Sequence, residues 1–284
     1  MMMRDGALQG RVILVTGGGT GLGKAMSTRL SELGAKVVIA ARDLDRLDRA
    51  AAEIAEKTGN KPLALQLDVR SPEACQAVVD ATVDRLGPID GLVNNAAGNF
   101  LVAAEDLSPG GFDAVVGIVM KGSFLMTQAV GRSMIEKKHP GAILSILTTY
   151  AWTGSAFVLP SAMAKAGVLA MTRSLAVEWG TAYGIRLNAI APGPFPTEGA
   201  WKALVPDQAA EEEFKKHNPL HRFGDPGELA DLAAFLLSPY SGYINGDCIT
   251  IDGGQWLKGA GEFNALSDHD RSQVRQMLQA MRGR

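Results

Sequence analysis

The stretch Thr16-Gly17-Gly18-Gly19-Thr20-Gly21-Leu22-Gly23 lies between a short apolar run, Val12 to Val15, and a segment with helical spacing that extends from about Leu22 to Leu33. Glycines permit a tight turn and a close approach of the backbone to a pyrophosphate. The N-terminus of the following helix offers free N–H groups and the positive end of its dipole. This placement between a strand and a helix predicts a dinucleotide site formed by Gly17, Gly18, Gly19, Thr20, Gly21 and Leu22.

Further short apolar runs recur along the chain and are separated by amphipathic helical patterns. They are Lys36 to Ala40, Leu63 to Leu67, Gly91 to Val93, Ala142 to Leu147, Ile185 to Ile190 and Cys248 to Ile251. Runs that are apolar throughout are typical of parallel strands buried on both faces. We therefore predict an α/β fold of the Rossmann type, a doubly wound parallel sheet of about seven strands with helices on both faces.

The 284 residues contain no repeat and no linker-like tract, which favours a single domain over 1–284. Within it, the Pro-containing segment 194–226 follows a strand end, where α/β proteins place loops that cover a substrate. Alternatively, this segment is an ordinary connection between two elements of the fold. The tail 255–284 has helical spacing from Arg271 to Met281 and is expected to be a C-terminal extension.

Composition excludes several classes of protein. The net charge of -2 argues against a nucleic-acid binder. A membrane-spanning helix needs about 20 consecutive apolar residues, and the sequence contains no such run. Cys75 and Cys248 form no CxxC pattern and are expected to be reduced thiols of a cytoplasmic protein. His217 and His221 have Pro219 between them, so we expect no metal site.

The residues at the end of the second apolar run indicate whether the site binds NAD or NADP. NAD sites usually carry a carboxylate here, but this chain has Ala41 followed by Arg42. A guanidinium can bind a 2′-phosphate in a planar fork, so Arg42 predicts NADP(H) rather than NAD. A solvated surface charge is the alternative interpretation of Arg42.

Two further strand ends carry polar residues suited to a cofactor. The carboxylate of Asp68 can accept from an adenine amino group. Asn94-Asn95-Ala96-Ala97-Gly98 has small residues that leave room beside a cofactor and amides that can tie neighbouring strands together. We count Asp68, Asn95 and Ala96 among the cofactor residues, although each could be purely structural.

These motifs together resemble the short-chain dehydrogenase/reductase superfamily, over about Gly10 to Gly254. The resemblance rests on the loop at Thr16 to Gly23, on Asp68, on Asn94 to Gly98, and on Pro192-Gly193 with Thr197. It implies that the nicotinamide end of the cofactor is bordered by Pro192, Gly193, Pro194, Phe195 and Thr197.

The catalytic pattern of that superfamily, Tyr-x-x-x-Lys with an upstream Ser, is altered in this chain. Lys165 is present, but Ser161 occupies the Tyr position and Thr148 the upstream Ser position. An aliphatic hydroxyl is a far weaker acid than a phenol. An ordinary ketone reductase is therefore disfavoured, and a non-catalytic NADP-binding protein has to be considered.

A phenol does stand nearby, because Tyr150 follows the fifth apolar run. Four stretches resemble the 2,4-dienoyl-CoA reductase family, which also has Ser in the usual Tyr position and Tyr after the strand. They are Asn94 to Phe100, Leu107-Ser108-Pro109, Thr148 to Lys165 and Gly261-Glu262-Phe263-Asn264. The resemblance implies that Tyr150 and Asn99 bind the thioester oxygen, that Lys165 holds the nicotinamide ribose and that Ser161 completes the hydrogen-bond network. It further implies substrate contacts from Phe100 and Ser108, and from Arg70 to the CoA portion.

The implied reaction is the transfer of hydride from NADPH to C5 of a 2,4-dienoyl-CoA to give a trans-3-enoyl-CoA, an auxiliary step of unsaturated fatty acid β-oxidation. The resemblance also implies a homotetramer. One departure concerns the CoA end, where the family has an Arg and this chain has Ala203 beside Lys202. Reduction of a 3-oxoacyl thioester or a ketone on the same scaffold is the alternative reaction.

Overall fold

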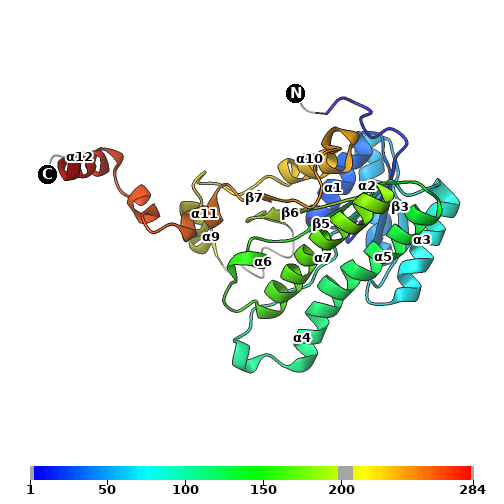
Figure 1. Ribbon diagram of the computed structural model, residues 1–284, viewed down its shortest axis with the longest axis horizontal. Coiled ribbons are helices and arrows are strands. Elements are labelled where there is room, and N and C mark those ends of the chain that lie inside the picture. Colours follow the sequence, from blue (N-terminus) through cyan, green and yellow to red (C-terminus); the bar gives the residue numbers. More distant parts are fainter. Residues whose placement is uncertain (1–2, 198–206, 283–284) are drawn as a thin grey trace.

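A seven-stranded parallel sheet forms the centre of the computed structural model, which describes residues 3–197 and 207–282 (Figure 1). The strand order is β3-β2-β1-β4-β5-β6-β7. The strands are β1 (Val12–Thr16), β2 (Lys36–Ala41), β3 (Leu63–Gln66), β4 (Gly91–Asn94), β5 (Ala142–Ile146), β6 (Arg186–Pro192) and β7 (Cys248–Ile251). The order reverses between β1 and β4, where the carboxyl ends of a doubly wound sheet leave a crevice. The predicted fold class is confirmed.

Helices cover both faces of the sheet and bury two separate cores. The helices α1 (Gly21–Glu32), α2 (Leu44–Thr58) and α10 (Pro226–Leu237) pack on one face, and α3 (Pro72–Leu86), α5 (Gly122–Glu136) and α7 (Leu159–Tyr183) on the other. In β1, Ile13 and Val15 belong to the first core and Val12 and Leu14 to the second. Two buried faces explain why this strand contains no charged residue.

The helix α2 shows how local sequence sets the boundaries of an element. Asp43 caps its N-terminus by accepting a hydrogen bond from the Arg46 amide at 3.0 Å. Gly59 ends it in a left-handed conformation with φ of 75°. Between them Leu47 and Ile54 recur on the buried side, as helical periodicity requires.

A long helical rod runs beside α7. It consists of α4 (Pro109–Val116), the π-helical turn η2 (Gly117–Lys121) and α5. Contrary to the sequence-based expectation, its 28 residues are long and apolar enough to span a membrane by composition. More than half of the apolar window, 56%, is buried inside the protein, as in the core helices of many proteins.

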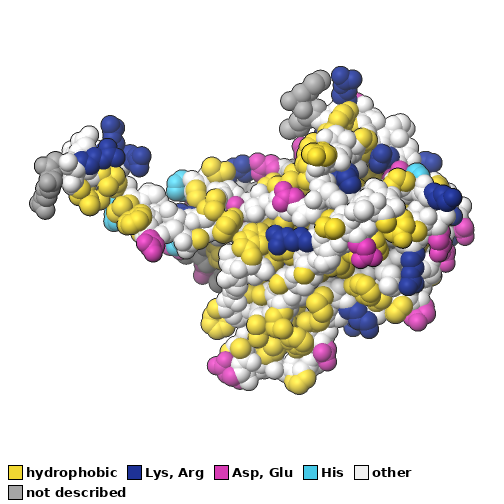
Figure 2. Space-filling view, viewed as in Figure 1, with side chains coloured by type: hydrophobic (Ala, Val, Ile, Leu, Met, Phe, Trp, Pro, Cys, Tyr) yellow, Lys and Arg dark blue, Asp and Glu magenta, His cyan; other side chains and the backbone are white. Residues whose placement is uncertain are grey.

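The segments that follow β6 and β7 lie at the carboxyl edge of the sheet and beyond it. Part of the predicted covering segment 194–226, residues 198–206, lies outside the described residues; α9 (Gln208–His217) follows it. After β7 come α11 (Gln255–Ala260) and α12 (Arg271–Arg282), and Figure 1 shows α12 lying apart from the body of the molecule. Figure 2 shows hydrophobic side chains gathered over α4 and dark blue Arg side chains on α12.

Candidate active site

An elongated cavity of about 640 Å³ opens at the carboxyl ends of the central strands. It begins at the glycine-rich turn after β1, passes the ends of β2, β3 and β4, and reaches the start of α7. It therefore brings together many of the residues predicted from sequence, among them Gly17, Thr20, Gly21, Leu22, Arg42, Asp68, Asn95, Ala96, Asn99, Tyr150, Ser161, Lys165, Pro192 and Thr197.

The glycine-rich turn is packed so closely that it leaves room for backbone only. Gly17 has φ of 66°, and a Cβ on Gly23 would lie 2.1 Å from the Gly17 carbonyl oxygen. Asn95 fixes this turn by donating from Nδ2 to the Thr16 carbonyl oxygen at 3.0 Å. The amides of Asn95 and Ala96 both donate to Thr16 Oγ1 at 3.0 Å. A tightly packed glycine-rich loop at the N-terminus of α1 fits the pyrophosphate of a dinucleotide.

The end of the cavity near β2 carries two guanidinium groups. Arg42 and Arg46 both line it, beside Ala41, which offers no carboxylate. Asp68 lines the same end, and its interaction with Arg70 lowers the pKa of this carboxyl to about 2. Because Arg70 already pairs with Asp68, the guanidinium groups of Arg42 and Arg46 supply positive charge that suits an anionic group on the ribose.

Three side chains surround the other end of the cavity. Tyr150, the first residue of the short helix α6 (Tyr150–Thr153), has its hydroxyl 3.1 Å from Ser161 Oγ. Lys165 lies one helical turn after Ser161 on α7, and its Nζ donates to the Ile146 carbonyl oxygen. Burial lowers the pKa of Lys165 to about 8. The phenol of Tyr150 therefore lies within hydrogen-bonding distance of the hydroxyl at position 161, in the cavity that Lys165 also lines.

Asn99 completes this end of the cavity from the loop after β4. Its side chain is exposed and lines the same space as Tyr150. A carboxamide N–H and a phenolic O–H are both hydrogen-bond donors. Such a pair can stabilise negative charge on an oxygen atom between them.

The comparisons with known proteins agree with this geometry. The family model for enoyl-(acyl carrier protein) reductase matches residues 17–255. A crystal structure of a short chain dehydrogenase from Bacillus anthracis superposes with a TM-score of 0.81 at 45% identity, covering 88% of this chain and 98% of the other. The chain belongs to the short-chain dehydrogenase/reductase superfamily.

Two curated relatives refine the placement of this reductase within the superfamily. A probable 2,4-dienoyl-CoA reductase of Bacillus subtilis, named as (2E)-enoyl-CoA-producing, is 47% identical over 88% of this chain and 98% of its own length. A probable 2,4-dienoyl-CoA reductase 3 of Caenorhabditis elegans, named as (3E)-enoyl-CoA-producing, is 44% identical over 89% of this chain and 83% of its own length.

Some predicted cofactor residues of this reductase lie behind the cavity rather than along it. Gly18 packs against Ile39 and Gly19 against Leu47, where a Cβ would lie 2.6 and 3.0 Å from the respective side chains. Gly193 packs on Asp252, while Pro194 and Phe195 line a separate small cavity. These residues shape the loops around the cofactor site, which is a role that the glycine pattern also predicts.

The predicted substrate residues are more dispersed. Arg70 lines an apolar groove beside η2 and binds Asp68 through Nε at 2.9 Å. Ser108 caps α4 by accepting from the Gly111 amide at 3.1 Å. Phe100 is 40% exposed and packs near Gly111. Lys202 and Ala203 lie outside the described residues.

The sequence interpretation missed several residues of the cavity. Arg46 lies in the first turn of α2, four residues after Arg42, and a second Arg so soon after the strand end could have identified it. Ile118, on the π-helical turn η2, gave no sequence signal. Within residues 3–197 and 207–282, no group of three His, Cys, Asp or Glu side chains is arranged as metal ligands.

Proposed function

We propose that this protein catalyses the NADPH-dependent reduction of a 2,4-dienoyl-CoA, an auxiliary step of unsaturated fatty acid β-oxidation. The observation that carries the proposal is the hydrogen bond between Tyr150 and Ser161, with Oη and Oγ 3.1 Å apart. The phenol of Tyr150, carried by α6 just after β5, lines the same cavity as Asn99 and Lys165. The names of the two relatives support the same substrate class.

The reduction of a conjugated thioester requires hydrogen-bond donors at the thioester oxygen, which lies several bonds away from the carbon that receives the hydride. Bound NADPH would supply a hydride to C5 of the conjugated acyl group. Negative charge then moves through the diene to the thioester oxygen, where Tyr150 and Asn99 donate hydrogen bonds. Each such donor contributes about 3 kcal/mol to stabilisation of the transition state. Lys165 holds the nicotinamide ribose, and Ser161 keeps the phenol of Tyr150 oriented.

The position of the final proton decides the product. Protonation of the dienolate at C2 gives a 3-enoyl-CoA, whereas protonation at C4 gives a 2-enoyl-CoA. We propose protonation at C2 by water, and hence the trans-3-enoyl product that the name of the C. elegans relative carries. The (2E) name of the B. subtilis relative makes product analysis by NMR an essential part of the test.

NADPH is the proposed cofactor because of the charge around its 2′-phosphate. Arg42 and Arg46 line the end of the cavity where a carboxylate would select NADH. Two guanidinium groups can bind a phosphate through charge-assisted hydrogen bonds.

A homotetramer is the proposed assembly. Large apolar side chains are exposed on several parts of the surface, among them Phe124 (45%), Val177 (72%), Tyr243 (105%) and Met281 (67%). Contacts between subunits would remove such side chains from water. A cytoplasmic location and the absence of nucleic-acid and membrane partners stay predictions from the sequence.

The decisive experiment mixes the purified protein with NADPH and a series of 2,4-dienoyl-CoA esters and follows the loss of nicotinamide absorbance. We expect turnover, and a decrease of about 100-fold in kcat for Tyr150→Phe. A 3-oxoacyl-CoA and a cyclic ketone serve as competing substrates. Folded protein that binds NADPH but reduces none of the dienoyl esters would refute the proposal.

A further inference from the structure

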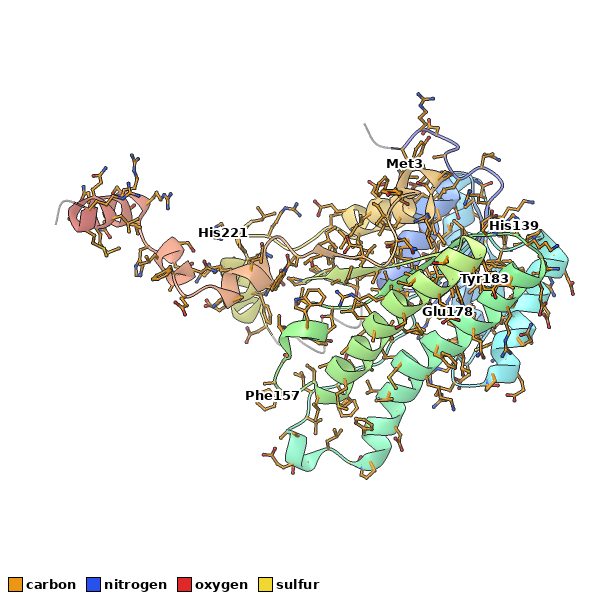
Figure 3. All side chains as sticks on the ribbon, in the orientation of Figure 1. Met3, His139, Phe157, Glu178, Tyr183 and His221 are labelled. Atoms are coloured by element: carbon orange, nitrogen blue, oxygen red, sulfur yellow. The ribbon has the colours of Figure 1, made fainter. Side chains whose placement is uncertain are left out.

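The short helix α6 carries Tyr150, and few side chains hold it in place. It is a single turn of four residues, none of which is buried, and no side chain caps its N-terminus. Every residue from 152 to 157 is exposed, and Phe157 at the end of this stretch has φ of 64° (Figure 3). The stretch is tied at its end to the loop after β4, where the Val102 amide donates to the Phe157 carbonyl oxygen at 3.0 Å. The next buried residue is Val158, at the start of α7. A segment of this kind has low local stability unless other elements anchor it.

Two side-chain contacts anchor α6 to other elements. Tyr150 is held by Ser161 on α7. Trp152 meets Trp256 of α11 edge to face, with ring centroids 5.8 Å apart and an interplanar angle of 84°. Aromatic pairs in this geometry contribute beyond the area that they bury. The second anchor thus comes from the C-terminal extension, more than 100 residues later in the chain.

Trp256 is itself fixed to the loop that borders the cofactor site. Its amide donates to Asp252 Oδ2 at 2.9 Å, and the Gly254 amide donates to Asp252 Oδ1 at 2.8 Å. Asp252 is only 8% exposed, and Gly193 packs against its Cβ. Asn218 also donates to the Asp252 carbonyl oxygen at 2.7 Å. The indole therefore has a rigid base that is continuous with the Pro192-Gly193 turn.

We propose that Trp256 is a positioning residue, whose ring holds Trp152 and thereby keeps the phenol of Tyr150 at the thioester oxygen. The proposal rests on the proposed function, because it acts through Tyr150. It assigns a role in catalysis to α11, which contributes no residue to the cavity among the described side chains. A displacement of about 1 Å at a reacting group can cost about 100-fold in rate.

The test compares Trp256→Ala, Trp256→Phe and the neighbouring control Leu257→Ala, whose side chain is 57% exposed on the same helix. We expect Trp256→Ala to lower kcat by about 10- to 100-fold while the Kd for NADPH stays within about twofold. Trp256→Phe should restore most of the rate, since a phenyl ring can keep the edge-to-face contact. Leu257→Ala should leave kcat unchanged.

A double-mutant cycle with Tyr150→Phe separates positioning from general stability. If Trp256 acts through the phenol, Trp256→Ala should have almost no further effect on kcat once that phenol is absent. An equal loss in both backgrounds, or a matching loss of NADPH affinity, would overturn the proposal.

Hydrogen exchange provides a readout that does not depend on the substrate. In the NADPH complex, the amides of 150–158 should exchange faster in Trp256→Ala than in the wild type or in Trp256→Phe. If no dienoyl-CoA is turned over, the proposed function fails. Faster exchange would then still support the anchoring of α6, and unchanged exchange would overturn it.

Discussion

Lys165 is a charged group in a place that disfavours charge. Its side chain is buried, with 8% exposed, and burial lowers its pKa from 10.5 to about 8. The folded protein therefore binds fewer protons than the unfolded chain between about pH 8 and pH 10.5. It follows that the charged amine destabilises the fold below this window, and that the penalty disappears as pH rises through it.

We predict that Lys165→Met is more stable than the wild type near neutral pH by roughly 1 to 3 kcal/mol, because it removes a buried charge. The difference should shrink as pH rises toward 10.5, where unfolded Lys also loses its proton. Denaturant unfolding of both proteins at several pH values measures it. A variant that is less stable at every pH would contradict the burial argument. The variant should also lose activity, since the amine no longer holds the ribose.

Arg42 tests the cofactor preference. We predict that Arg42→Ala raises the Kd for NADPH by about 10- to 100-fold, because a charge-assisted hydrogen bond contributes roughly 1.5 to 3 kcal/mol to binding. NADH has no 2′-phosphate, and its Kd should change by less than about twofold. Titration of cofactor fluorescence gives both constants. An equal effect on the two cofactors would remove Arg42 from the phosphate site; Arg46→Ala is the companion variant.

At the scale of elements, the joint between β1 and α1 depends on one close contact. A Cβ on Gly23 would lie 2.1 Å from the Gly17 carbonyl oxygen and 2.6 Å from Asn95 Nδ2. The Gly17 carbonyl is part of the backbone, so it cannot move aside as the end of a flexible side chain could. The start of α1 would have to move, and its N–H groups would no longer face the cofactor.

We predict that Gly23→Ala destabilises the protein by about 2 kcal/mol or more and raises the Kd for NADPH at least tenfold. Gly110→Ala is the matched control, since no atom of the described residues lies within 4 Å of its added Cβ and it sits in α4. That variant should be neutral or slightly stabilising, because alanine favours a helix. Thermal unfolding with and without NADPH distinguishes the two, and a Gly23→Ala protein with normal binding would disprove the packing argument.

On the scale of the whole molecule, the exposed apolar face of α12 is one of the surfaces that a single chain leaves uncovered. Met277, Leu278 and Met281 are 41%, 42% and 67% exposed on a helix that lies apart from the body (Figure 1). A helix of 12 residues is marginal in water without such packing. The homotetramer proposed above would give this face a partner.

We predict a mass in solution of four times the 29.9 kDa of the chain. Light scattering after size exclusion measures it. Met277→Ser with Met281→Ser should weaken the assembly if α12 contributes to it, whereas Gln276→Ala on the polar side of the helix should not. A monomeric wild type would contradict the prediction.

The sequence by itself determined the scaffold and much of the chemistry. Apolar runs such as Val12 to Val15 fix a strand because both of its faces are buried, and the glycine turn fixes the pyrophosphate end of the site. Both signals are local, and helix boundaries such as Asp43 and Gly59 are local as well. The pairing of Ser161 with Tyr150 was anticipated from resemblance to a family whose pattern it matches.

Only the tertiary structure decided what depends on contacts between distant segments. The edge-to-face contact of Trp152 with Trp256 joins a strand-end helix to the C-terminal extension, and no spacing in the chain encodes it. The depressed pKa of Lys165 likewise follows from the burial that packing imposes. Periodicity reports which face of an element is buried, whereas the identity of the neighbour depends on how the chain returns through space.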